Sequence, residues 1–112
     1  MGKEKQWINM PIRMVSGWAS EWCVLCAVLD DDGNIVEFND SEDILWFRHL
    51  REPFSIDAGW YRDRFVVHFL DEKPSDMITW DQAVCATREV QTAEEMIALV
   101  EQWMVKPPDE AY

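Results

Sequence analysis

The chain has 112 residues, of which 48% are hydrophobic and 29% are charged. This is the composition of one globular domain that can bury a core without disulfide or metal staples. Its 22 acidic and 10 basic residues give a net charge of −12. Such a charge argues against direct binding of nucleic acid or of an anionic membrane, since both require basic patches, and favours a basic partner or simply solubility.

We expect a single domain over residues 1–112, with frayed termini at about 1–6 and 107–112. The opening MGKEKQW is not followed by the apolar region of a signal peptide, and Gln6 occupies the Ser/Thr position of a myristoylation signal. No apolar run approaches the ~20 residues of a membrane span. The chain is therefore expected to be cytoplasmic, with its three cysteines reduced.

The first predicted elements are strands. One covers residues 7–15 and is followed by a turn at Ser16-Gly17, and a second covers residues 21–30. Asp32-Gly33 has the residue types of a type I′ turn and predicts a hairpin that returns the chain into a third strand over residues 34–38.

A helix is expected next, over about residues 39–52. Asn39, Asp40 and Ser41 are all suitable N-cap residues, and Asn39 with Glu42 has the spacing of a capping box. The helix must end before Pro53, because the residue that precedes a proline avoids the helical conformation.

A strand over residues 63–70, rich in β-branched and aromatic residues, follows this helix. Residues 77–90 are ambiguous between strand and helix, and we favour a strand. Thr92 and Glu95 then form a capping box for a final amphipathic helix that must end near Lys106, ahead of two prolines. Its apolar positions recur at helical spacing, at Met96, Leu99, Val100 and Trp103. The order β-β-β-α-β-β-α predicts an α+β fold, an antiparallel sheet of about five strands with two helices on one face.

The segment EWCVLCAVLDDDGN, residues 21–34, is apolar on both faces if it is one strand. Cys23 and Cys26 then point to opposite faces and cannot bind one ion together. The remaining candidate ligands, His49, His68 and Cys85, are scattered singly. We therefore predict no metal site and no cofactor, and expect the cysteines to be packing residues.

Catalytic motifs are missing as well. The chain has no GxSxG, no HExxH and only four glycines, none in a phosphate-binding loop. His49 or His68 could act as a general base, but a lone histidine is more often structural. The protein is therefore not expected to be an enzyme.

Acidic residues are concentrated in two stretches. Residues 14–47 contain eight acids and no Lys or Arg, and residues 71–112 carry a net charge of −7, whereas residues 44–70 carry +1. This +1 region contains WYRDRF, whose Trp, Tyr and Arg are the residue types that dominate interface hot spots. The predicted partner-binding residues are Asp30, Asp31, Asp32, Glu37, Asp40, Glu42, Asp43, Trp60, Tyr61, Arg62 and Arg64.

These features favour an acidic, protein-binding inhibitor or immunity-type protein. By analogy, it could be a phage-encoded, anti-CRISPR-like blocker that mimics nucleic acid on a basic surface of its target. The alternative is a small homo-oligomeric cytosolic protein whose seven tryptophans line a ligand pocket. Apolar residues on both faces of residues 21–30, and the run Ile44 to Phe47, also predict a homodimer.

Overall fold

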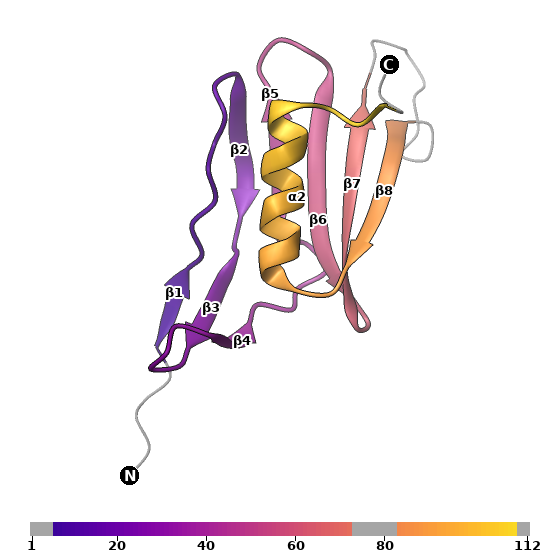
Figure 1. Ribbon diagram of the computed structural model, residues 1–112. Coiled ribbons are helices and arrows are strands. Elements are labelled where there is room, and N and C mark those ends of the chain that lie inside the picture. The colour runs from indigo at the N-terminus through magenta and orange to yellow at the C-terminus, as the bar shows by residue number, and fades with distance from the viewer. Residues whose placement is uncertain (1–5, 73–82, 110–112) are drawn as a thin grey trace.

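The computed structural model describes residues 6–72 and 83–109. This part of the chain forms eight strands and one helix (Figure 1). The elements are β1 (Trp7–Asn9), β2 (Trp18–Cys23), β3 (Cys26–Leu29), β4 (Ile35–Phe38), β5 (Leu45–His49), β6 (Phe54–Tyr61), β7 (Arg64–Asp71), β8 (Val84–Val90) and α2 (Ala93–Val105). The main sheet has five strands in the order β2-β5-β6-β7-β8, and the small sheet has three in the order β1-β3-β4. All pairs are antiparallel, so the α+β class is confirmed.

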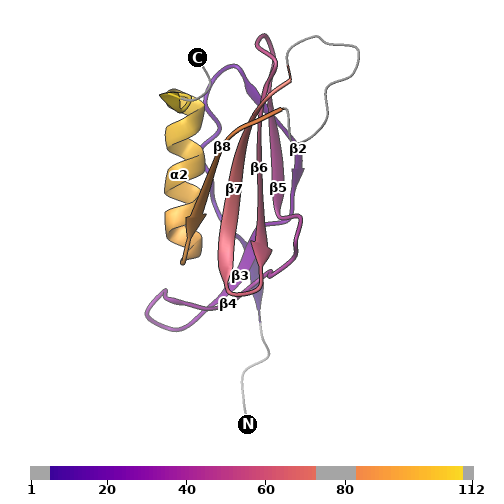
Figure 2. The same cartoon turned by 90° about the vertical axis from the view of Figure 1, so that its right-hand side faces the viewer.

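Helix α2 lies along one face of the main sheet, as Figures 1 and 2 show from two sides. We call this the inner face and the opposite one the outer face. On β7, every second residue, namely Phe65, Val67 and Phe69, lies on the inner face and is fully buried. Met96 and Val100 of α2 are equally buried. Each large apolar side chain buried in this way contributes roughly 1.5–3 kcal/mol, so this layer carries most of the stability.

Helix α2 begins and ends where the sequence predicts. The Thr92 hydroxyl accepts a hydrogen bond from the Glu95 amide at 3.1 Å and donates one to the Glu95 carboxylate at 3.0 Å. Met96, Val100 and Trp103 are buried as expected, whereas Leu99 is only half-buried. The N-cap at Thr92 and the helix end near Lys106 are confirmed, whereas the Glu95 carboxylate accepts from the Thr92 hydroxyl and not from its backbone amide as in a capping box.

The predicted helix over residues 39–52 is wrong, because its second half is strand β5. Leu45 and Phe47 are buried while Trp46 between them is 40% exposed, which is the period of a strand and not of a helix. Asn39 and Ser41 bond to backbone only two residues away, with Asn39 Oδ1 accepting from the Ser41 amide and Ser41 Oγ accepting from the Asp43 amide. Residues that favour N-caps also favour such turns, and here the turns are formed.

Strand β6 was not predicted, although its neighbour β7 was. Every second residue of β6 is apolar and faces the inner side of the sheet, whereas Ser55, Asp57 and Gly59 lie between them and face the outer side. The β6–β7 hairpin closes through a turn in which Arg62 has a φ of 62°. Of the ambiguous residues 77–90, the strand prediction is confirmed for β8, and residues 77–82 lie outside the described part of the chain.

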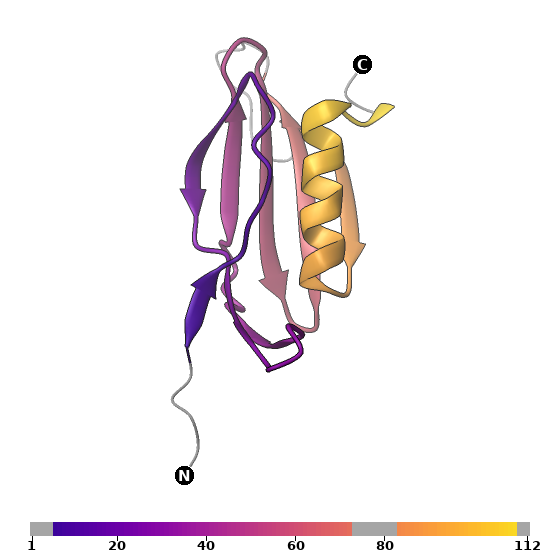
Figure 3. The ribbon, with the colours of Figure 1, turned by 60° about the vertical axis from the view of Figure 1, so that its left-hand side comes forward.

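The predicted strand over residues 21–30 is two strands in two different sheets. The chain leaves the main sheet after Cys23 and enters the small sheet at Cys26 (Figure 3). Between them, the Val24 amide donates to the Ile44 carbonyl at 2.8 Å, and the Leu25 carbonyl accepts from the Met10 amide at 3.0 Å. The segment is apolar throughout because it passes between sheets, and not because one strand is covered on both sides. The first predicted strand is likewise shorter and ends at Asn9.

The β3–β4 hairpin is confirmed, but its turn is not type I′. That turn needs positive φ at both central residues, and here only Gly33 has it, at 85°. The Asp30 amide donates to the Asn34 carbonyl at 2.9 Å, and the Asp30 carbonyl accepts from the Gly33 amide at 3.0 Å, so the loop has one residue more than predicted. The Asp30 carboxylate also accepts from the amides of Asp32 and Asn34, which stabilises the turn.

Candidate functional site

The outer face of the main sheet carries a continuous row of side chains, one from each strand. In register, Trp22 on β2 pairs with Trp46 on β5, Trp46 with Asp57 on β6, Asp57 with His68 on β7, and His68 with Thr87 on β8. Helix α2 lies on the other side of the sheet (Figure 2). The row therefore belongs to the face that the helix leaves uncovered.

Trp22 reaches this face because of a β-bulge. Trp18 and Trp22 are four residues apart and would share a face in a regular strand, yet Trp18 is buried in the core and Trp22 is 53% exposed. The register against β5 shifts between Ser20 and Trp22, which makes Glu21 the extra residue. A slip of one residue turns a side chain to the opposite face, and bulges often re-aim side chains at functional sites.

Beside the two tryptophans lies an open hollow of about 370 Å³, which we call the Trp hollow. It is lined by Glu21, Trp22, Asp43, Leu45, Trp46 and Asp57. The Trp22 indole N–H donates to the backbone carbonyl of Asp43 at 3.4 Å. Since that N–H lies in the plane of the ring, the bond positions the indole without using its π faces.

Gly59 allows Asp43 to reach the Trp hollow. The Trp60 amide donates to the Ser41 carbonyl at 2.9 Å, so the chain before β5 is held against β6. The next residue, Glu42, then crosses directly over Gly59, and a Cβ at Gly59 would overlap the Glu42 carbonyl. Only a glycine permits this close approach, which brings Asp43 near Asp57.

The carboxylates of the Trp hollow are not neutralised. Burial, and secondly the charge of Asp43, raise the pKa of Asp57 to about 6. The pKa of Tyr61 is also raised, by burial and then by Asp57, Asp43 and Glu42. Within residues 6–72 and 83–109, neither Asp43 nor Asp57 forms an ion pair. The site thus combines exposed aromatic surface with uncompensated negative charge.

The predicted acidic residues fall in several places. Asp30, Asp31 and Asp32 lie at the β3–β4 turn, Glu37 lies on β4, and Asp40 lies in the connection before β5. Of the acids predicted to bind a partner, only Asp43 lines the Trp hollow, with Glu42 beside it in the chain. The acidic stretch is therefore not one surface.

The predicted aromatic and basic residues are partly structural. Trp60 is half-buried, with its ring centroid 4.9 Å from that of Phe38 and 4.8 Å from that of Phe65. Arg64 forms an ion pair with Glu89 at 3.0 Å. Tyr61 is partly exposed on the outer face, and Arg62 forms the adjoining turn.

Of the residues that line the Trp hollow, the sequence predicts only Asp43 as a binding residue. The sequence predicts Trp22 on a strand without a bulge and Trp46 in a helix, and Asp57 lies on β6, for which no strand is predicted. The alternation of apolar residues in residues 54–60 is a usable signal for β6, and the apolar run from Ile44 to Phe47 fits a strand as well as a helix.

The cysteines and histidines have local roles. Cys23 is exposed, so the packing role predicted for it is wrong, whereas Cys26 and Cys85 are partly buried. His49 Nδ1 accepts from the amides of Arg51 and Glu52 at 3.0 and 2.9 Å. His68 Nδ1 lies 2.9 Å from Thr87 Oγ1, and burial lowers the pKa of His68. In the described part of the chain, no three His, Cys, Asp or Glu residues gather as metal ligands.

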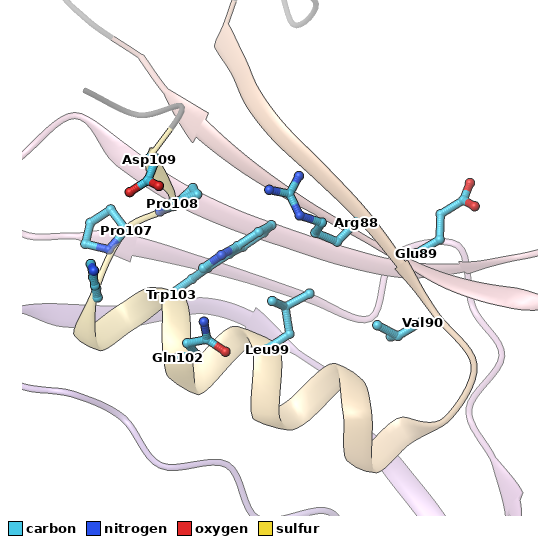
Figure 4. A pocket seen from close by; sticks show the side chains of 10 residues that line it. Arg88, Glu89, Val90, Leu99, Gln102, Trp103, Pro107, Pro108 and Asp109 are labelled. Atoms are coloured by element: carbon cyan, nitrogen blue, oxygen red, sulfur yellow. The ribbon is translucent and has the colours of Figure 1, made fainter.

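A second hollow, of about 430 Å³, lies between β8 and the end of α2 (Figure 4). Its aromatic residue, Trp103, is only 3% exposed, and the guanidinium of Arg88 lies 5.8 Å from the centre of its ring. The buried Pro108 also lines it. Because the Trp103 ring already contacts the guanidinium of Arg88, this second hollow is a weaker candidate binding site than the Trp hollow.

Comparisons with protein-family models, with curated proteins and with solved structures found no match. No helix in residues 6–72 and 83–109 is long and apolar enough to cross a membrane. A functional proposal must therefore come from the geometry of the Trp hollow and the charge around it.

Proposed function

We propose that this protein is an acidic, protein-binding inhibitor of the immunity-protein type, which acts in the cytoplasm on a partner that presents a basic surface. The observation that carries the proposal is the Trp hollow, where two exposed indoles stand among three acids on a sheet face that α2 leaves open. By analogy, the target would be a nucleic-acid-handling enzyme, and the protein a phage-encoded blocker of such an enzyme.

The residue types support an interface. Trp is strongly enriched at interface hot spots, and a rigid sheet presents it with little loss of conformational entropy on binding. Trp22 and Trp46 are 53% and 40% exposed, although a soluble protein gains nothing from showing two large rings side by side to water. A partner that covers both rings would explain why the bulge at Glu21 turns Trp22 to the outer face.

The charge supports a basic partner. The net charge is −12, and neither Asp43 nor Asp57 forms an ion pair with another residue of the described ranges 6–72 and 83–109. Carboxylates held on a rigid sheet can bind the Lys and Arg side chains of a partner that otherwise bind phosphate, and this would block its nucleic-acid site. The opposite charges would also increase the rate at which the two proteins associate. A carboxyl whose pKa burial has raised is also a feature of functional sites.

A Trp-lined ligand pocket in a homo-oligomer is the second candidate. The Trp hollow has a volume of about 370 Å³, within the range of small-molecule sites, and two of its walls are tryptophans. In this case a second copy of the chain would close the open side. The predicted dimer, with Arg48, Arg51, Arg62 and Arg64 set against the acidic stretch of the other chain, is tested by sedimentation equilibrium, where a single species at 13.2 kDa would reject it.

The deciding experiment compares capture by three immobilised proteins from a lysate of the natural host. They are the wild type, the double variant Trp22→Ser/Trp46→Ser, and the control Trp7→Ser, which changes an equally exposed Trp on β1. We expect a basic protein that the wild type and the control retain, that the double variant loses, and that elutes at about 1 M salt, where charges are screened within ~3 Å.

The captured protein is then tested for nucleic-acid binding with and without the wild-type chain. Competition between the chain and the nucleic acid supports the inhibitor function. The inhibitor function is contradicted if the captured protein is retained equally at high salt and by the double variant.

A further inference from the structure

We infer that the Trp hollow is a receptor for one arginine side chain of the protein partner, whose guanidinium stacks on indole and bonds to the surrounding carboxylates. This inference rests on the proposed function and names the chemistry that the partner must present.

The indoles supply the stacking surface. Trp22 and Trp46 are direct partners on adjacent antiparallel strands, where Cβ atoms lie about 4.5–5.5 Å apart. The two side chains therefore rise side by side from the sheet and share the hollow that both line. A cation near an indole face is attracted by the ring quadrupole, and a planar guanidinium can also stack on it.

The carboxylates supply the charge. Glu21, Asp43 and Asp57 line the same hollow, and within residues 6–72 and 83–109 no Lys or Arg lines it. Three acids without a counter-ion repel phosphates and carboxylates, so an anionic ligand is excluded. Glu21 comes from the bulge, Asp43 from the chain that crosses Gly59, and Asp57 from β6, so three separate elements converge on one cation site.

The geometry favours arginine over lysine. A guanidinium is planar, weakly hydrated, and donates in a fixed fork that matches a carboxylate, whereas an ammonium is a compact and strongly hydrated charge. Only the guanidinium can lie flat on an indole while its edge bonds to Asp43 or Asp57. The hollow is open to solvent on one side, so a side chain can enter it from a protein surface.

Binding should also depend on pH. Asp57, with its pKa near 6, has Asp43 from the chain before β5 and Glu21 from β2 beside it in the hollow, Tyr61 on its own strand, and His68 opposite it on β7. Trp46, its partner on β5, does not titrate. At acidic pH Asp57 becomes neutral, and protonation of His68 would place a positive charge beside it. Both changes weaken the attraction for a cation.

The test is an NMR titration of the ¹⁵N-labelled full chain with three synthetic peptides that differ at one residue type. Each peptide contains six arginines, six lysines or six citrullines, separated by Gly-Ser. We expect the arginine peptide to shift the indole N–H signals of Trp22 and Trp46 but not those of Trp7 or Trp103. It should bind severalfold more tightly than the lysine peptide, and about tenfold more weakly at pH 5 than at pH 7.5.

Two variants define the outcome. Trp46→Ala should abolish the shift at Trp22, and Asp57→Asn, which keeps the shape of the side chain, should weaken binding of the arginine peptide and remove most of its pH dependence. Equal binding of the citrulline peptide, or shifts confined to other tryptophans, would overturn the inference.

The two proposals can fail separately. If a basic partner is captured with salt sensitivity but the double variant Trp22→Ser/Trp46→Ser still binds it, the arginine receptor is wrong and a basic partner remains. If the arginine peptide binds in the Trp hollow but no host protein is captured, the inhibitor function is wrong and the receptor remains.

Discussion

Replacing Asp57 with asparagine should make the protein more stable at neutral pH. In the folded state burial and Asp43 raise the pKa of this carboxyl from 3.8 to about 6. Between these two values the folded chain binds more protons than the unfolded chain, so the wild type loses stability as pH rises through this window. Asparagine does not titrate, so the variant is spared that loss.

The size of the effect follows from the two pKa values. At about 1.4 kcal/mol per pH unit, the interval from 3.8 to about 6 corresponds to a ceiling of about 3 kcal/mol. Asp57 is only half-buried, so solvent screening reduces this value, and we expect a gain of about 1 kcal/mol at pH 7.5 and almost none near pH 4.

Urea unfolding followed by far-UV circular dichroism at both pH values measures this gain. Circular dichroism is chosen because the fluorescence of Trp46 would respond to the substitution itself. Asn34→Ser, which replaces a neutral residue at the exposed β3–β4 turn, is the matched control, and its effect on stability should be the same at both pH values. An Asp57→Asn variant that is equally stable or less stable than the wild type at pH 7.5 would refute the reasoning.

Substitutions at three further positions test which contacts hold the fold. Gly59→Ala should cost about 2–3 kcal/mol in urea unfolding, because its Cβ would overlap the Glu42 carbonyl, and a neutral result would show that this crossing is loose. Arg62→Gly should raise the midpoint of thermal unfolding by relieving about 1 kcal/mol of left-handed strain at a φ of 62°, and a lower midpoint would contradict this. Thr92→Ala should lower the unfolding free energy by about 1 kcal/mol through loss of the cap to Glu95, while Thr92→Ser should retain most of it.

Elements with local signals could be predicted from the sequence. The final helix has its cap at Thr92 and its apolar stripe within one short window, and the β3–β4 hairpin has Gly33 at its turn. Residues 39–52 have the sequence signals of a helix but do not form one, because Asn and Ser side chains make the same kind of hydrogen bond in helix caps and in turns. Tertiary pairing with β2 and β6 then decides in favour of a strand.

The Trp hollow could not be predicted by the same reasoning. Its position depends on the bulge at Glu21, which appears only when β2 is paired with β5. Strict alternation along β2 places Trp22 on the same face as Trp18, which is the core. The approach of Asp43 to Asp57 likewise depends on which residue lies opposite Gly59.

The bond between the Trp18 indole N–H and the Met104 carbonyl, at 3.0 Å, joins residues 86 positions apart. By contrast, β6, β7, β8 and α2 follow one another in the chain, and each strand pairs with the next one. Because long loops close slowly, we expect β6, β7, β8 and α2 to fold first and β2 to join the sheet edge last. During translation β2 leaves the ribosome long before its anchor on α2 exists. In a nascent chain the edge strand β2 would therefore lack its hydrogen bond to α2 until Met104 has been made, so the main sheet would be fully anchored only with the last turn of the helix.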